Sequence, residues 1–176
     1  MNKKQISTKA MVLSGVFIAT SVILTRFFGF MLFAGTVRLS LGIIPIAMAG
    51  AILGPVYGGI VGALADIMGA ILFPQGAYFP GFTATAFVQG LIPGLIIHKA
   101  FISKTVDKKK LMIYVVISMV LTTIIASLGM NTLWLSILFK KGFLVMLPGR
   151  LVTSISVGII NTIVLGIMLN MLKNKV

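Results

Sequence analysis

The sequence predicts an all-α membrane protein, a bundle of six transmembrane helices whose N- and C-termini are both cytoplasmic. Of its 176 residues, 59% are hydrophobic and only 10% are charged, and the mean hydropathy is +1.15. A soluble domain needs far more charge on its surface. The net charge of +13 comes from basic residues between apolar runs, a pattern typical of bilayer insertion rather than of nucleic-acid binding. At this length we expect one integral membrane domain over residues 1–176.

Six apolar runs give the predicted helices, near residues 10–26, 39–53, 56–72, 82–100, 111–138 and 148–172. The first follows three lysines, as a secretory signal would, but it continues into apolar sequence without a cleavage pattern, so we expect an uncleaved helix. Only Gly54-Pro55 divides the second run from the third. A loop rich in proline and aromatic residues precedes the fourth, lysines precede the fifth, and Pro148 begins the sixth.

Several runs are shorter than the roughly 20 residues of a simple span, so the basic residues provide a second test of the count. With six spans and the N-terminus inside, the cytoplasmic side carries ten lysines: Lys3, Lys4, Lys9, Lys99, Lys104, Lys108, Lys109, Lys110, Lys173 and Lys175. The outer side carries five basic residues: Arg26, Arg38, Lys140, Lys141 and Arg150. This distribution obeys the positive-inside rule, whereas merging the second and third spans would place the lysine-rich segment outside.

All three arginines of the chain, Arg26, Arg38 and Arg150, fall at the predicted outer ends of helices. The guanidinium group is a planar fork of donors that suits a carboxylate or a phosphate. Three guanidinium groups at the outer face of the bundle indicate an outward-facing site for an anion. The alternative, equally open from the sequence, is that each arginine reaches the interface or pairs with a lipid phosphate.

The third predicted helix places Gly58, Gly62 and Asp66 on one face at four-residue spacing. Small residues let helix backbones approach in lipid, and a carboxylate facing hydrocarbon costs about 2.5 to 3.5 kcal/mol, so this face should pack against protein. Asp66 therefore needs a partner. Two partners are open: donors of a ligand, or one of the arginines.

Two outer connections are unusually apolar. Residues 73–82 contain two prolines and two glycines, which prevent a regular helix, together with the aromatic side chains of Tyr78, Phe79 and Phe82. Residues 26–38 are also too apolar for a free aqueous loop. We expect both connections to fold over the bundle as a lid or wall, the alternative being simple anchoring at the membrane interface.

Asn131 and Trp134 lie three residues apart near the outer end of the fifth helix, so they share a face. An indole plane beside an amide suits a flat heteroaromatic ring, stacked on its face and hydrogen-bonded at its edge. A lone tryptophan near a helix end is also typical of the interfacial belt.

Gly15 and Ala19 form a small-xxx-small pair near the inner end of the first helix, where they suit either docking of another membrane protein or packing within the chain. Catalysis is disfavoured, because the chain has no cysteine and His98 has no second metal-ligating residue nearby in the sequence. We find no nucleotide-binding motif and expect no cofactor and no metal. Binding or transport is therefore the favoured class.

Five segments carry a family resemblance: LGIIPIAMAG at 41–50, GPVYG at 54–58, GALAD at 62–66, FPQGAYFPGFT at 73–83 and LPGRLV at 147–152. They resemble the folate-specific substrate-binding (S) component of energy-coupling-factor (ECF) transporters, and the segment after the third helix is the most specific of them. The resemblance implies a six-helix vitamin binder of the bacterial plasma membrane. It also implies a transmembrane coupling protein and two ATPase subunits as partners, and no nucleic acid.

Folate has a ring system and a glutamate tail with two carboxylates. The resemblance and this chemistry together assign Arg26 and Arg150 to the anionic groups, and Asn131 or Asp66 to the edge of the pterin ring. The ring-enclosing side chains would be Tyr78, Phe79, Phe82 and Trp134. In the family an Ala-xxx-Ala pair meets the coupling protein, and Gly15-xxx-Ala19 stands in its place here. The alternatives are an S component for another vitamin, such as riboflavin, and a membrane assembly protein without a transport role.

Overall fold

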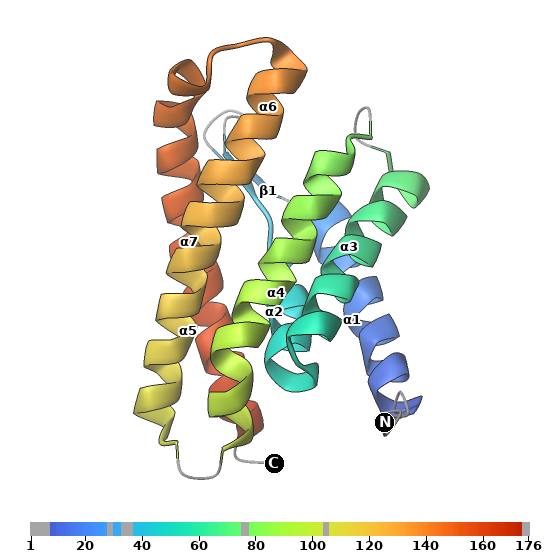
Figure 1. The fold of residues 1–176 in the computed structure, drawn as a ribbon, viewed down its shortest axis with the longest axis vertical. Helices are drawn as coiled ribbons and strands as arrows, with labels where there is room; N and C mark the ends of the chain where they lie inside the picture. The colour runs from blue at the N-terminus through green and yellow to red at the C-terminus, as the bar shows by residue number, and fades with distance from the viewer. Residues whose placement is uncertain (1–7, 28–29, 33–36, 75–77, 104–105, 174–176) are drawn as a thin grey trace, which may run out of the picture.

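The computed structural model describes residues 8–27, 30–32, 37–74, 78–103 and 106–173. The helices and strands run in the order α1 (Thr8–Arg26), β1 (Phe30–Leu32), β2 (Val37–Leu39), α2 (Ile43–Leu53), α3 (Pro55–Leu72), α4 (Pro80–Ile102), α5 (Lys108–Thr122), η1 (Thr123–Met130), α6 (Asn131–Phe139) and α7 (Phe143–Lys173). The segments α5, η1 and α6 follow one another without a break and form one long helical span (Figure 1).

The predicted bundle of six helical spans is confirmed. Five spans are long and apolar enough to cross a membrane, and α2 is shorter, at 11 residues. The start of α1 and the end of α7 lie at the same end of the bundle (Figure 1). We call this the inner end, and we call the opposite end, which carries the α3–α4 and α6–α7 connections, the outer end.

Two predicted helix starts are corrected by the structure. The second helix begins at Ile43 and not near 39, because Val37–Leu39 pairs with Phe30–Leu32 as an antiparallel hairpin that the sequence analysis did not anticipate. The last helix begins at Phe143, five residues before Pro148. Pro148 therefore lies inside the helix, where it removes one backbone hydrogen bond, and the apolar segment before it continues the helix outward.

Glycine packs α2, α3 and α4 into one block. A Cβ atom built on Gly90 of α4 would lie 1.9 Å from the carbonyl oxygen of Gly58 on α3, and one built on Gly62 would lie 2.0 Å from the carbonyl oxygen of Ala86. The helix backbones therefore touch, as the spacing of Gly58 and Gly62 predicts.

The inner half of the bundle is filled by a core that joins α2, α4, α5 and α7. Its fully buried members include Ile97, Leu111 and Leu165. Lys173 at the end of α7 donates hydrogen bonds to the carbonyl oxygens of Ala100 and Val106, which ties α7 to the α4–α5 connection. A smaller cluster joins α1 to α2 and α3. The space for a ligand therefore lies above this core, toward the outer end.

Candidate functional site

A cavity of about 230 Å³ lies between α1, α2, α3, α4, η1 and α7. Three of the predicted site residues line it, namely Arg26, Asp66 and Arg150. They come from three different helices that the sequence separates by many residues, so the fold brings both signs of charge to one concave site. Hydroxyl groups from α1, η1 and α7 add to its polar lining.

Arg26 is the last residue of α1 and lies over Gly69 of α3. A Cβ atom built on Gly69 would be 3.0 Å from the Nε atom of Arg26, so the guanidinium group lies closely against the α3 backbone and would have to shift slightly for a larger residue. The Nε atom is buried and has no hydrogen-bond partner among the described residues. The helix end thus presents a charged donor to the cavity.

Arg150 reaches the cavity from α7. One of its terminal nitrogens donates a hydrogen bond of 3.2 Å to the carbonyl oxygen of Ser127, while its Nε atom is buried without a partner in the described part of the chain. The carbonyl belongs to η1, a π-helical turn region of eight residues. Such segments are rare and are often found at functional sites. The predicted convergence of arginines therefore holds for Arg26 and Arg150, whereas the side chain of Arg38 lies outside the described residues.

Asp66 accepts a hydrogen bond of 2.7 Å from the hydroxyl of Thr83, and that hydroxyl is 3.0 Å from the hydroxyl of Tyr78. The chain of hydrogen bonds joins α3 to the start of α4. Within the described residues the partner of Asp66 is therefore a threonine, which neither of the two sequence-based alternatives included. The carboxylate still lines the cavity, so it remains available to a ligand from that side.

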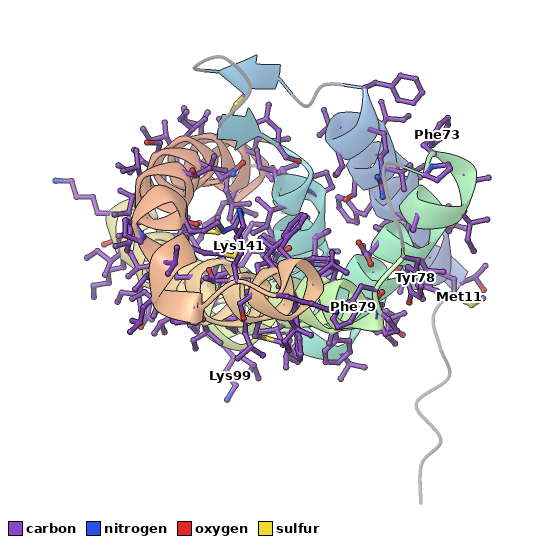
Figure 2. All side chains as sticks on the ribbon, turned by 90° about the horizontal axis from the view of Figure 1, so that it is seen from above. Met11, Phe73, Tyr78, Phe79, Lys99 and Lys141 are labelled. Carbon is purple, nitrogen blue, oxygen red and sulfur yellow. The ribbon has the colours of Figure 1, made fainter. Side chains whose placement is uncertain are left out.

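The predicted aromatic residues gather beside the cavity. Phe79 packs against Phe82 with ring centroids 5.9 Å apart and against Trp134 with centroids 5.7 Å apart. The indole nitrogen of Trp134 donates a hydrogen bond of 3.1 Å to Thr85. Seen from the outer end, Phe73, Tyr78 and Phe79 lie on the side of the molecule away from α7 (Figure 2).

This aromatic cluster of Phe79, Phe82 and Trp134 joins the start of α4 to α6. None of the three, and neither Tyr78 nor Asn131, is among the residues that line the described cavity. Their predicted contact with a ligand thus stays a prediction.

Two amides that sequence reasoning missed also line the cavity, the half-buried Gln89 on α4 and the buried Asn161 on α7. Their signal was present in the sequence, because an amide inside an apolar span needs a partner within the protein or in a cavity. Serine and threonine are too frequent in these spans to single out the hydroxyls that line the cavity.

The pair at Gly15 and Ala19 lies on the open face of α1. Both residues are exposed, and a Cβ atom built on Gly15 would meet nothing within 4 Å. Among the described residues nothing therefore packs against Gly15, as the alternative use of the pair, packing within this chain, would require. The face is free to meet another membrane protein or lipid.

Comparison with known proteins gives a consistent result. The sequence profile of the family described as ECF-type riboflavin transporter, S component, matches residues 5–173. A folate transporter, FolT, of Clostridium novyi (strain NT) is 39% identical over 142 residues, which are 81% of this chain and 77% of the relative. A folate transporter, FolT, of Leuconostoc mesenteroides is 26% identical over 179 residues, covering 98% of this chain and 89% of the relative.

The fold agrees with a solved structure as well. A structure described as the crystal structure of FolT bound with folic acid superimposes with a TM-score of 0.74 at 33% sequence identity, covering 92% of this chain and 94% of that chain. These proteins are transporter components and not enzymes. Since the profile match and the shared fold extend over almost the whole length, this chain belongs to the family of S components of ECF-type transporters.

Proposed function

We propose that this chain is the folate-binding S component of an ECF transporter, and that it captures folate at the outer face of a bacterial plasma membrane for uptake. The observation that carries the proposal is the cavity at the outer side of the core, with Arg26 and Arg150 in its wall. The folate transporters among its relatives and the folic-acid-bound structure with the same fold support the choice of ligand.

The chemistry of folate fits this cavity. Its glutamate tail carries two carboxylates, and each guanidinium group can bind a carboxylate through two parallel hydrogen bonds. We assign Arg26 and Arg150 to this tail. Asp66 or Asn131 binds the edge of the pterin ring, and the aromatic residues Tyr78, Phe79, Phe82 and Trp134 enclose the rings.

The open face of α1 suits the coupling protein. Gly15 and Ala19 have no large side chains, so a partner helix could approach the backbone of α1 closely there. Two ATPase subunits bound to the coupling protein would supply the energy for transport.

Calorimetric titration of the detergent-purified protein tests the choice of ligand. We expect folic acid to bind with high affinity and one-to-one stoichiometry, and thiamine, which is a cation, to be rejected by the two arginines. Reconstitution with a coupling protein and two ATPases should then give ATP-dependent uptake of folic acid. Binding of thiamine in place of folic acid would contradict the proposal.

Riboflavin is the second candidate, because the matching family profile is described by that vitamin. Riboflavin carries no carboxylate and would leave the guanidinium groups of Arg26 and Arg150 without an anion. The two ligands are therefore distinguished by the same titration. Tight riboflavin binding that is indifferent to Arg150→Ala would keep the family and replace the substrate.

A further inference from the structure

The turn between α6 and α7 carries two lysines, Lys140 and Lys141, at the outer end of the bundle. Both side chains are exposed, and within the described residues neither ammonium group takes part in a hydrogen bond or an ion pair. The backbone of the turn is held independently of them, by hydrogen bonds from the N–H groups of Lys140 and Lys141 to the carbonyl oxygens of Ile137 and Ser136. The fold therefore leaves both charges free to act on something outside the chain.

Lys140 has a backbone conformation that lysine rarely adopts. Its φ is 53° and its ψ is 34°, and in the described part of the chain it is the one residue other than glycine with a positive φ. Glycine is the usual residue at this position after a helix, because a Cβ atom makes the left-handed conformation unfavourable. Positive charge is favourable at the end of a helix, but Lys141 supplies it without strain. The turn itself therefore does not require a lysine at position 140.

The turn lies above the cavity on the outer side. Seen from the outer end, Lys141 lies inside the outline of the bundle, between α7 and α2, whereas Lys99 points away from the bundle at its edge (Figure 2). Arg150 lies seven residues after Phe143, the first residue of α7, which places it about 10 Å below the turn. An anion that enters from the outer side therefore passes close to the two lysines on its way to Arg150.

Negative charge is scarce at this end of the molecule. The chain has only two acidic residues, and Asp107 is at the inner end, where it precedes α5. The other, Asp66, lines the cavity and accepts a hydrogen bond from Thr83. One carboxylate thus opposes Arg26, Arg150 and the two lysines of the turn. The outer end therefore has a positive potential, which the apolar surroundings of the cavity concentrate.

We propose that Lys140 and Lys141 attract the dianionic ligand toward the cavity and thereby set the rate at which it binds. The proposal rests on the proposed function, in which the ligand carries two carboxylates. A distance of about 10 Å equals the screening length at about 0.1 M salt and is well inside the roughly 30 Å at about 0.01 M. The attraction should therefore be strong in dilute salt and largely screened in concentrated salt. Arg26 and Arg150, which are assigned to the bound carboxylates, instead determine how fast the ligand leaves.

Stopped-flow mixing of the purified protein with folic acid in an uncharged detergent tests this role. Binding is followed by energy transfer from Trp134, the single tryptophan of the chain, to the pteridine. In Lys140→Gln/Lys141→Gln we expect the association rate constant at about 10 mM salt to fall by about 3-fold to 10-fold, and the dissociation rate constant to change by less than about 2-fold. At about 0.5 M salt the difference in association should disappear. The matched control is Lys108→Gln/Lys109→Gln, at exposed positions of the inner end, which should bind like the unchanged protein.

Lys140→Gly separates the charge from the conformation of the turn. Glycine suits the left-handed backbone at this position, so the thermal stability of the variant should be equal to that of the unchanged protein or higher. Association at low salt should nevertheless be slower, because one of the two charges is gone. A purely structural role of Lys140 predicts the reverse, a less stable protein that binds folic acid at the unchanged rate.

Three results would overturn the inference. The association rate of the unchanged protein could be independent of salt, a measurement that needs no variant. Lys140→Gln/Lys141→Gln could bind folic acid at low salt as fast as the inner-end control does. The difference between these two variants could also be absent in the uncharged detergent and present only in vesicles that contain phosphatidylglycerol, in which case the lysines bind lipid headgroups and not the ligand. Absence of folic-acid binding by the unchanged protein would instead overturn the proposed function itself.

Discussion

The two walls of the cavity are held together by different contacts. On one side, α2, α3 and α4 meet backbone to backbone, so that a Cβ atom on Gly50, Gly58 or Gly90 would collide with main-chain atoms. On the other side, the glycines of α7 face side chains or open space: Gly158 faces Thr123 of η1, and Gly149 has nothing within 4 Å. We call these two regions the glycine block and the α7 wall.

This difference in packing indicates that the glycine block and the α7 wall have different roles in the site. The glycine block has contacts that tolerate almost no change of volume, so it fixes the positions of Asp66 and Gln89. The α7 wall is joined to the rest through side chains and a π-helical segment, and it carries Arg150 and Asn161. One wall thus provides a rigid reference, and the other provides Arg150, one of the two arginines that are proposed to bind the carboxylates of the ligand.

The largest effect is expected inside the glycine block. Gly90→Ala places a methyl group 1.9 Å from the carbonyl oxygen of Gly58, which α3 and α4 can relieve only by moving apart. We expect a loss of at least about 3 kcal/mol in unfolding free energy, measured as a fall in thermal stability in detergent. Gly149→Ala on the α7 wall is the control and should leave stability nearly unchanged. Equal effects at both sites would remove the distinction between the walls.

Arg150→Ala addresses the α7 wall. Loss of a charged bidentate donor should weaken folic acid by about 100-fold in calorimetry while the protein stays folded. Arg150→Lys should recover only part of the affinity, because it restores the charge and not the planar fork. The control is Lys108→Ala, at an exposed position of the inner end. Undiminished binding by Arg150→Ala would show that the recognising groups lie on the glycine block.

Trp134 ties α6 to the glycine block, since its ring packs on Phe79 and its N–H donates a hydrogen bond to Thr85 of α4. We expect Trp134→Ala to lower the unfolding free energy by about 2 kcal/mol, less than for a fully buried tryptophan, with a smaller effect on affinity than Arg150→Ala. Trp134→Phe should recover most of the stability by restoring the ring. An affinity loss as large as that of Arg150→Ala would instead place the indole directly against the ligand.

The smallest effect on the isolated protein is expected outside both walls. Gly15→Leu and Ala19→Leu add side chains on the open face of α1, so thermal stability and folic-acid affinity should stay unchanged. ATP-dependent uptake in reconstituted vesicles should be lost, because the added side chains keep the coupling protein from the α1 backbone. Uptake at the normal rate would contradict the proposed docking face. A loss of affinity would mean that α1 supports the cavity through this face.

The fold was largely readable from the sequence, since each span is a long apolar run and the basic residues fix their number. The hairpin was not, because strands of three residues, such as Val37–Leu39, are too short to show a periodic pattern. Nor does any local composition predict that η1 adopts π-helical hydrogen bonding.

Of the residues that line the cavity, only the charged ones could be predicted from the sequence. Arg26, Asp66 and Arg150 stand out in an apolar chain, and the structure brings them to one cavity. Asn131 and Asn161 look alike in sequence, yet only Asn161 lines the cavity, since the rotation of α6 and α7 in the bundle decides which amide faces inward. That rotation depends on tertiary packing and not on local pattern.

The packed inner half of the bundle has a consequence for the membrane itself. Ile97, Leu111, Val115 and Leu165 have 0% or 1% of their surface exposed, so among the described residues a closely packed apolar core separates the cavity from the inner end. We therefore expect a membrane that holds many idle copies of this protein to keep its proton and sodium gradients. In electrical terms, we expect the protein to insulate like the surrounding bilayer, although it has a recess on its outer side.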